Sequence, residues 1–340
     1  MNILIAGING YFGRVLSRYL IDTGFRVFGV DRNIDYRLEN INYQELDLSI
    51  AFTDATLFPG VSFDILVDLA TEIDFAAHSM RSLYLNNVNI VSNLIDFAVK
   101  RDISRYIYTS SNSVYLGNES SFIKESDLPV PEDEYGRSKV TCEQLLLNNH
   151  NGLSVSILRC PNIIDAGRIG MLSILFELLE ENATIWTIDS GSVIHQCIYA
   201  QDLCVAISLL FKINKSEIYN IGCDNVESFH SIFVNLIKRT NSNSKIRSIP
   251  KWLALPILKF LYFIGMSPMG AYQFRMLTKD YVSDVSKLKN EINWNPTLDN
   301  ASMLSLAYDY YIKNKNSLYG SANSAPVKMG FLNILKYIKI

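Results

Sequence analysis

The sequence is poor in the residues that build disulfide frameworks, zinc sites and membrane spans. Its 340 residues include five cysteines and four histidines. The cysteines stand singly in apolar segments, without C-x-x-C pairs or histidines at zinc spacing. We therefore expect reduced core cysteines and no metal site. No apolar stretch reaches the ~20 residues that a membrane-spanning helix needs.

Strong positive charge is also missing. The net charge is −3, the isoelectric point is about 5.9, and the sequence has no basic stripe. Nucleic acid is therefore not an expected partner. A small ligand is expected instead. The N-terminus enters an apolar strand without the basic and apolar regions of a secretory signal, which predicts a cytoplasmic protein.

Two apolar stretches bear on membrane association. Trp252–Gly265 contains Pro256 and Lys259 and is too short to span a bilayer, so a buried or half-buried helix is expected. Phe331–Ile340 carries two lysines among apolar residues; we expect it to pack on the protein body, with a membrane surface as the alternative. Firm membrane association is not predicted.

Short apolar strands alternate with helical segments along the first 160 residues. This pattern predicts a parallel sheet covered on both faces, that is, a doubly wound α/β (Rossmann) fold, with a smaller α/β cap lobe after it. The expected strands are Ile3–Ala6, Arg26–Val30, Phe63–Val67, Arg105–Thr109, Ser154–Leu158 and, later in the chain, Glu217–Gly222. We expect residues 1–162 and 196–222 in the first domain, 163–195 and 223–300 in the cap lobe, and 301–340 as a C-terminal helix and tail.

A glycine-rich turn follows the first expected strand. Gly7, Gly10 and Gly13 form the G-x-x-G-x-x-G run, and a helix from Arg14 to Thr23 comes next. Glycines at this turn let the backbone and the helix N-terminus approach a pyrophosphate. Asp31 ends the second strand, where an acid binds the adenosine ribose and disfavours a 2′-phosphate. The residues therefore predict NAD, although Arg32 leaves NADP open.

Tyr135 and Lys139 stand four positions apart in an expected helix and so share one face. A nearby ammonium favours the phenolate, which suits Tyr135 to proton exchange with a substrate hydroxyl. Ser110 and Ser111 follow the strand that ends nearby in the expected sheet and bring a hydroxyl to the same rim. Tyr311 and Lys315 have the same spacing, but there we expect an ordinary helix end with solvated lysines.

These motifs together resemble the extended short-chain dehydrogenase/reductase superfamily and, within it, the NAD-dependent nucleotide-sugar epimerases and dehydratases related to UDP-glucose 4-epimerase. The likeness runs through nearly the whole chain, to Trp294-Asn-Pro296. It implies that Tyr135 is the acid/base, that Lys139 holds the nicotinamide ribose and that Ser111 binds the reacting hydroxyl. The full set of cofactor contacts that it implies, with those predicted above, is Gly7, Asn9, Gly10, Tyr11, Phe12, Gly13, Asp31, Arg32, Asp47, Leu48, Leu69, Ala70, Thr71, Asn87, Ser110, Tyr135 and Lys139.

On the substrate side, the resemblance implies contacts from Ser111, Asn112 and Asn162. Two departures stand out. Asp68 replaces a common histidine, and His195 falls where many family members carry an arginine that binds the diphosphate. Arg275 is the expected replacement for that cation, with a surface arginine on a cap helix as the alternative.

The reaction expected from the resemblance is C4 epimerisation of a nucleotide-linked sugar through a 4-keto intermediate. Alternatives are a 4-keto-sugar reductase using NAD(P)H, a 4,6-dehydratase, disfavoured because Asn112-Ser113 replaces the usual Asp-Glu pair, and a non-catalytic NAD sensor. The helix Asn86–Val99 and the helix after Tyr135 carry apolar residues beyond one face, Ile95 and Phe97 among them, and the resemblance implies that they pair in a homodimer.

Overall fold

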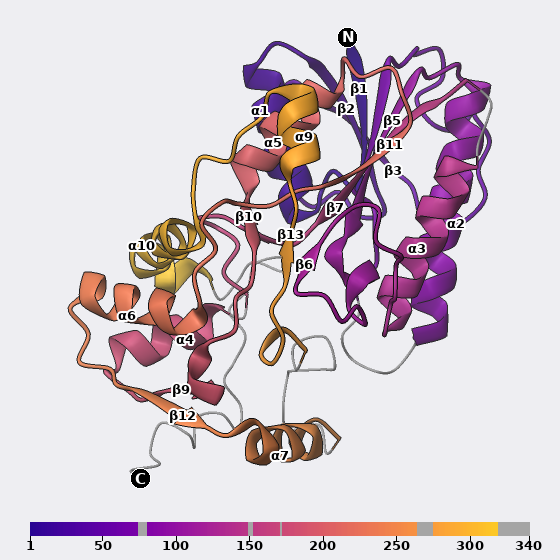
Figure 1. The fold of residues 1–340 in the computed structure, drawn as a ribbon. Helices are drawn as coiled ribbons and strands as arrows, with labels where there is room; N and C mark the ends of the chain where they lie inside the picture. The colour runs from indigo at the N-terminus through magenta and orange to yellow at the C-terminus, as the bar shows by residue number, and fades with distance from the viewer. Residues whose placement is uncertain (74–79, 149–151, 171, 264–274, 319–340) are drawn as a thin grey trace.

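The computed structural model describes residues 1–73, 80–148, 152–170, 172–263 and 275–318. Its larger lobe is built on a seven-stranded sheet in the order β11-β7-β5-β4-β1-β2-β3, with every neighbouring pair parallel. The predicted doubly wound parallel sheet is confirmed (Figure 1). The strands are β1 (Asn2–Ala6), β2 (Arg26–Asp31), β3 (Asn42–Glu45), β4 (Ile65–Asp68), β5 (Arg105–Ser111), β7 (Ser154–Cys160) and β11 (Glu217–Asn220).

Helices cover both faces of this sheet. On one face lie α1 (Tyr11–Asp22), α5 (Ala200–Leu210) and α9 (Ser286–Ile292), and on the other α2 (Met80–Lys100) and α3 (Glu134–Leu147) (Figure 1). Apolar side chains on each face of the sheet pack against these helices, forming two cores. Strands buried on both faces need near-continuous apolar sequence, which is why they could be recognised.

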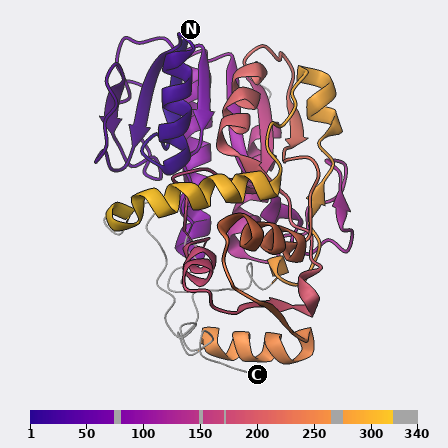
Figure 2. The ribbon, with the colours of Figure 1, turned by 90° about the vertical axis from the view of Figure 1, so that its left-hand side faces the viewer.

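The cap lobe contains small elements from several separate parts of the chain. Its helices are α4 (Leu172–Glu180), α6 (Phe229–Thr240), α7 (Lys251–Phe263) and α10 (Asn300–Leu318). Short parallel pairs join β8 (Asn162–Ile164) to β10 (Cys197–Tyr199), β9 (Ile185–Ile188) to β12 (Ile246–Ile249), and β6 (Phe122–Ile123) to β13 (Val282–Ser283). Figure 2 shows α10 between the sheet and the rest of this lobe, and α7 at the end of the molecule away from the sheet.

Two expectations about packing are wrong. Helix α7 forms over nearly the predicted residues, but Trp252, Phe260 and Phe263 are exposed rather than buried. Phe97, expected on an outer face of its helix, is buried in the core beside Phe52 and Phe63. The expected tail segment Phe331–Ile340 lies outside the described residues.

Candidate active site

The glycine turn between β1 and α1 makes a close backbone cradle. Gly7 has a φ of +78°, and a Cβ there would lie 2.7 Å from the backbone nitrogen of Ala70. A Cβ on Gly13 would collide with the carbonyl oxygen of Gly7. Gly10 occupies the N-cap position before α1, and no side chain caps the helix. The N-terminal amides of α1 therefore face the turn, as binding of a pyrophosphate requires.

A cavity of about 320 Å³ opens beside this turn. Ten of the predicted cofactor residues line it: Gly7, Asn9, Gly10, Asp31, Arg32, Asp47, Leu48, Leu69, Ala70 and Thr71. Asp31 accepts a hydrogen bond from the backbone N–H of Asn9 at 2.9 Å, and burial raises the pKa of its carboxyl. The cavity thus has the acid at its ribose end and the glycine turn beside it, and these residues fit NAD.

Six further residues, which the sequence analysis did not predict, line the same cavity: Asn33, Asp35, Leu46, Ser49, Glu72 and Ile90. Two of them are acidic and hold basic neighbours. Asp35 accepts from Arg14 Nη2 at 2.8 Å, and Glu72 forms an ion pair with Arg32. Because these acids stand in loops, where no periodicity marks their direction, their place in the cavity was not predictable from spacing.

The loop after β4 is fixed by hydrogen bonds to buried side chains. Asp68 is buried, accepts from Tyr106 Oη at 2.7 Å and from the N–H of Ala70 at 3.0 Å, and burial raises its pKa to about 6. Asn87 accepts from the N–H of Glu72 at 2.8 Å and donates to Ser138 Oγ at 3.2 Å. Asn87, predicted to contact the cofactor, therefore ties the cofactor loop to α3 in this structure.

Two predicted cofactor residues on α1 point elsewhere. Phe12 is buried in the core beneath the sheet. Tyr11 donates from its hydroxyl to Asp165 Oδ2 at 2.8 Å, and burial raises the pKa of that phenol. Tyr11 thereby links the cofactor helix to the loop after β8, where the cap lobe begins.

Tyr135 and Lys139 lie at the start of α3, which Asp133 caps by accepting from the N–H of Gly136 at 2.6 Å. Lys139 is buried, and its Nζ donates to the carbonyl oxygen of Thr109 at 3.0 Å. The same nitrogen lies 5.7 Å from the ring centroid of Tyr135. The tyrosine is half-buried. The predicted pair therefore meets at the carboxyl end of β5.

The two serines at the end of β5 have different environments. Ser111 is half-buried and accepts from the N–H of Ser113 at 3.1 Å, capping a short 3₁₀ turn, Asn112–Tyr115. Ser110 is buried and donates to Glu143 Oε1 at 2.5 Å. Ser110, predicted beside the cofactor, thus contacts a carboxylate inside the protein.

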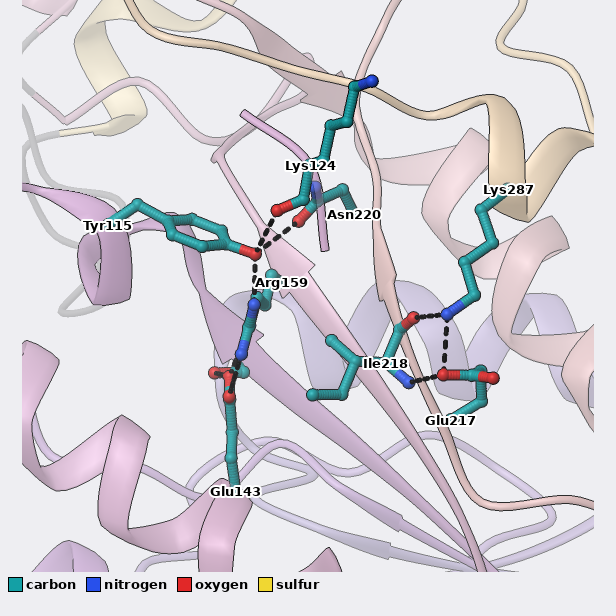
Figure 3. Close-up of polar contacts among 9 residues, drawn as sticks. Tyr115, Lys124, Glu143, Arg159, Glu217, Ile218, Asn220 and Lys287 are labelled. Atoms are coloured by element: carbon teal, nitrogen blue, oxygen red, sulfur yellow. Dashed lines mark hydrogen bonds and ion pairs between the residues drawn. The ribbon is translucent and has the colours of Figure 1, made fainter. Parts of the chain in front are cut away.

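Glu143 belongs to a buried polar network beneath the site (Figure 3). It lies one turn after Lys139 and pairs with Arg159 of β7, the Nη2–Oε2 distance being 2.6 Å; each side chain is 3% exposed. Arg159 also donates to the hydroxyl of Tyr115, which in turn contacts the carbonyl oxygen of Lys124 at 3.2 Å. This network fixes α3 against β5 and β7. Glu143 lies eight positions after Tyr135 on the same helix, a signal that sequence analysis missed.

The substrate-side predictions have mixed outcomes. Asn162 is exposed at the start of β8, whereas Asn112 is buried and its carbonyl oxygen accepts from the hydroxyl of Tyr281. Arg275 forms an ion pair with Glu132. His195 is buried with its ring stacked between Phe229 and Tyr281, and burial lowers its pKa to about 4. The structure therefore corrects the contact predicted for His195, because the ring is enclosed by aromatic side chains.

Another cation lies near the site. Arg168 follows β8 and is adjacent to Gly167, which approaches the hydroxyl of Tyr11. Burial lowers the pKa of the Arg168 guanidinium. The second Tyr-x-x-x-Lys copy agrees with the expected amphipathic helix end, because Lys313 is exposed and the side chain of Lys315 is 42% exposed. Tyr311 is buried in the cap lobe, and Lys315 pairs with Glu180 at 2.6 Å.

Comparisons with known proteins agree with this architecture. The chain is 28% identical over 342 residues to the uncharacterised protein y4nG of Sinorhizobium fredii, covering 98% of this chain and 85% of that one. A UDP-glucose 4-epimerase of Thermotoga maritima, solved with UDP-glucose, has a TM-score of 0.74 at 19% identity and covers 93% of this chain and 100% of its own. The enzyme WbmG of Bordetella bronchiseptica, solved with NAD and UDP, has a TM-score of 0.76 at 16% identity, covering 96% and 98%.

The family model for the NAD dependent epimerase/dehydratase family matches residues 3–222. This range includes the glycine turn, Asp31, the two serines at the end of β5 and the Tyr135/Lys139 pair. NAD is the cofactor of the family, and the cradle and acid described above fit it. The chain belongs to the NAD dependent epimerase/dehydratase family.

Proposed function

We propose that the protein inverts C4 of a nucleotide-linked sugar through a 4-keto intermediate, without net oxidation. The observation that carries the proposal is the position of Tyr135 and Lys139 on one face of α3, with Ser111 at the end of the adjacent strand. Bound NAD would supply the hydride acceptor and donor at the sugar carbon.

In this proposal Tyr135 takes the proton of the C4 hydroxyl and returns it after the 4-keto sugar has turned its opposite face to the cofactor. The Lys139 ammonium, 5.7 Å from the Tyr135 ring centroid, stabilises negative charge on the phenol. Thr109 fixes that ammonium through its carbonyl oxygen. Ser111 donates to the oxygen at C4 and orients it. The burial of Lys139 keeps water from screening this interaction.

The substrate diphosphate needs a cation and hydrogen-bond donors. We assign Asn162 as a donor, because it is exposed where β8 begins. Arg168 suits the cationic role, since it lies in the loop after β8 next to Gly167, where an added Cβ would lie 3.1 Å from the hydroxyl of Tyr11. Arg275 suits it less, because Glu132 neutralises it.

The first test is chemical analysis of the purified protein. Mass spectrometry and absorbance are expected to find NAD bound at close to one per chain. NMR is then expected to show epimer formation from UDP-glucose or UDP-glucuronic acid without added cofactor. An empty cofactor site together with consumption of added NADPH and a 4-keto sugar would contradict the epimerase and indicate a reductase.

We also propose a cytoplasmic homodimer formed through α2 and α3. These helices lie side by side, with Tyr84 Oη and Thr141 Oγ1 3.0 Å apart, and Leu85 and Leu145 are exposed on them. Light scattering is expected to give the mass of two chains, and Leu85→Glu with Leu145→Glu the mass of one. A single-chain mass for the wild type would refute the dimer.

A further inference from the structure

Helix α7 presents apolar side chains to solvent. Trp252 is 76% exposed, Phe260 62% and Phe263 86%, and Leu253 and Ile257 are exposed beside them. Ordinary surface helices turn such residues toward the core. A contiguous apolar surface of this kind is a feature of interaction sites.

These residues share one side of α7. At 100° per residue, Trp252, Phe260 and Phe263 fall within one arc, together with Leu253 and Ile257. Ala254, on the opposite side, is buried. The helix has 13 residues, about 20 Å at 1.5 Å per residue, which is too short for a ~30 Å bilayer core. In the described part of the chain, no helix has the length and apolarity needed to span a membrane.

The sequence around α7 is rich in basic residues, although Asp189, from the turn after β9, accepts a hydrogen bond from the backbone N–H of Lys251 at 2.7 Å. Between Glu227 and Asp280 the sequence has eight basic residues and no acidic ones, although the whole chain has a net charge of −3. Lys245 and Arg247 on and beside β12 are exposed, as is Lys259 on α7. β12 leads directly into α7 at the same end of the molecule (Figure 1). Cationic side chains therefore flank the apolar surface.

We propose that α7 lies in the interface of an anionic lipid bilayer, with its aromatic side inserted among the acyl chains and the flanking lysines and arginine at the phosphates. A short helix with an aromatic apolar side and basic flanks has the composition of an interfacial helix. A second copy of the chain is a poorer occupant, because two such cationic segments repel each other. Nucleic acid is poorer too, because it offers nothing to the aliphatic side chains.

The test uses the full-length protein and vesicles of phosphatidylglycerol and phosphatidylethanolamine, with phosphatidylcholine vesicles for comparison. Flotation is expected to show binding to the anionic vesicles. The triple variant Trp252→Ser, Phe260→Ser, Phe263→Ser should bind at least tenfold more weakly. Each of Lys245→Gln, Arg247→Gln and Lys259→Gln should weaken binding about fivefold, since a basic residue near an anionic surface contributes about 1 kcal/mol.

The matched control is Ile50→Ser with Leu128→Ser, which removes two apolar side chains that are 65% and 80% exposed elsewhere and should leave vesicle binding unchanged. Retained NAD content in the triple variant shows that it has folded. The proposal fails if the wild type ignores anionic vesicles, or if the triple variant binds them equally well. It also fails if the triple substitution instead lowers the mass in solution, or if the wild type binds DNA and not vesicles. None of these readouts depends on the proposed epimerase activity.

Discussion

Helices α3 and α7 both reverse the usual pattern of a surface helix, in opposite ways. α3 turns polar groups inward: Lys139 and Glu143 are buried, each with a hydrogen-bonded partner. α7 turns aromatic groups outward. Burying charge costs free energy unless it is paired, and exposing hydrocarbon costs free energy unless something covers it. The first cost is met within the chain, whereas the second calls for a partner outside it.

The same contrast distinguishes the two lobes. In the sheet lobe, Asp68, Glu143 and Arg159 are buried and hydrogen-bonded to neighbours. In the cap lobe, His195 is buried among aromatic rings, and within the described residues neither ring nitrogen has a hydrogen-bond partner. The contrast holds for these groups and not for every buried polar atom, since the buried hydroxyls of Ser113 and Ser156 in the sheet lobe also have no hydrogen-bond partner among the described residues.

The largest effect is expected at the reactive end of α3. Tyr135→Phe should lower kcat by about 10²-fold or more, because proton transfer by a placed acid/base contributes roughly 10² to 10⁴. Bound NAD should stay near the wild-type content. Tyr311→Phe is the control, since that ring lies in the cap lobe, and it should be silent. A kcat within a few-fold of the wild type would remove Tyr135 from the mechanism.

Breaking the buried pair tests the support of that helix. Glu143→Ala should lower the free energy of unfolding by about 3–5 kcal/mol, because Arg159 is left buried without its counter-charge. Urea denaturation measures this. The exposed pair Arg239–Asp309 is the control, and Asp309→Ala should cost no more than about 1 kcal/mol.

Apolar replacement separates stability from positioning. Glu143→Leu with Arg159→Met should recover most of the stability, as buried pairs replaced by apolar residues often do. If the pair positions α3, kcat should remain low in this double variant while KM changes little. Full recovery of kcat would make the pair structural only.

His195 provides a pH-dependent test in the cap lobe. Its pKa of about 4 in the folded protein lies below the 6.5 of a free histidine. Between these pH values the histidine is protonated in the unfolded chain and neutral in the folded one. Stability from this group is therefore complete above pH 6.5 and falls as the pH drops toward 4. Between pH 7 and 5 the loss is about 2 kcal/mol. The drop in unfolding free energy should be smaller by that amount in His195→Phe; equal drops would refute burial of the ring.

The smallest effect concerns cofactor choice at the mouth of the cavity. Glu72 holds Arg32 in an ion pair, which keeps the Arg32 guanidinium away from a 2′-phosphate. The carboxylate of Asp31 repels the same phosphate. Glu72→Gln should shift the ratio of dissociation constants toward NADP(H) by up to about tenfold. Adding Arg32→Ala should reverse the shift. An unchanged ratio in Glu72→Gln would show that Asp31 alone sets the preference.

The features that sequence analysis recovered are those with a local signature. The sheet strands are continuous apolar segments, and the glycine turn and the Tyr135/Lys139 pair depend on short spacings. The strands that were missed, such as β6 and β13, have two residues each and exist only by pairing with each other across 160 positions. Such pairs have no periodicity to detect.

Side-chain direction was the other limit. His195 was placed by its position in a motif, but its surroundings come from Phe229 and Tyr281, which are distant in sequence. The apolar composition of α7 predicted burial, and this prediction was wrong. Composition alone does not reveal how little of the remaining chain packs against a helix. Glu143 could have been found, since its spacing from Tyr135 places both on one helical face.

Return of the original hydrogen to C4 is the most direct test of the proposed reaction. The protein is incubated with UDP-glucose or UDP-glucuronic acid in D₂O, and the product is analysed by NMR and mass spectrometry. Inversion at C4 with no deuterium on that carbon and no net consumption of cofactor is the expected result. Deuterium at the inverted carbon, or one NADPH consumed for each product formed, would contradict it.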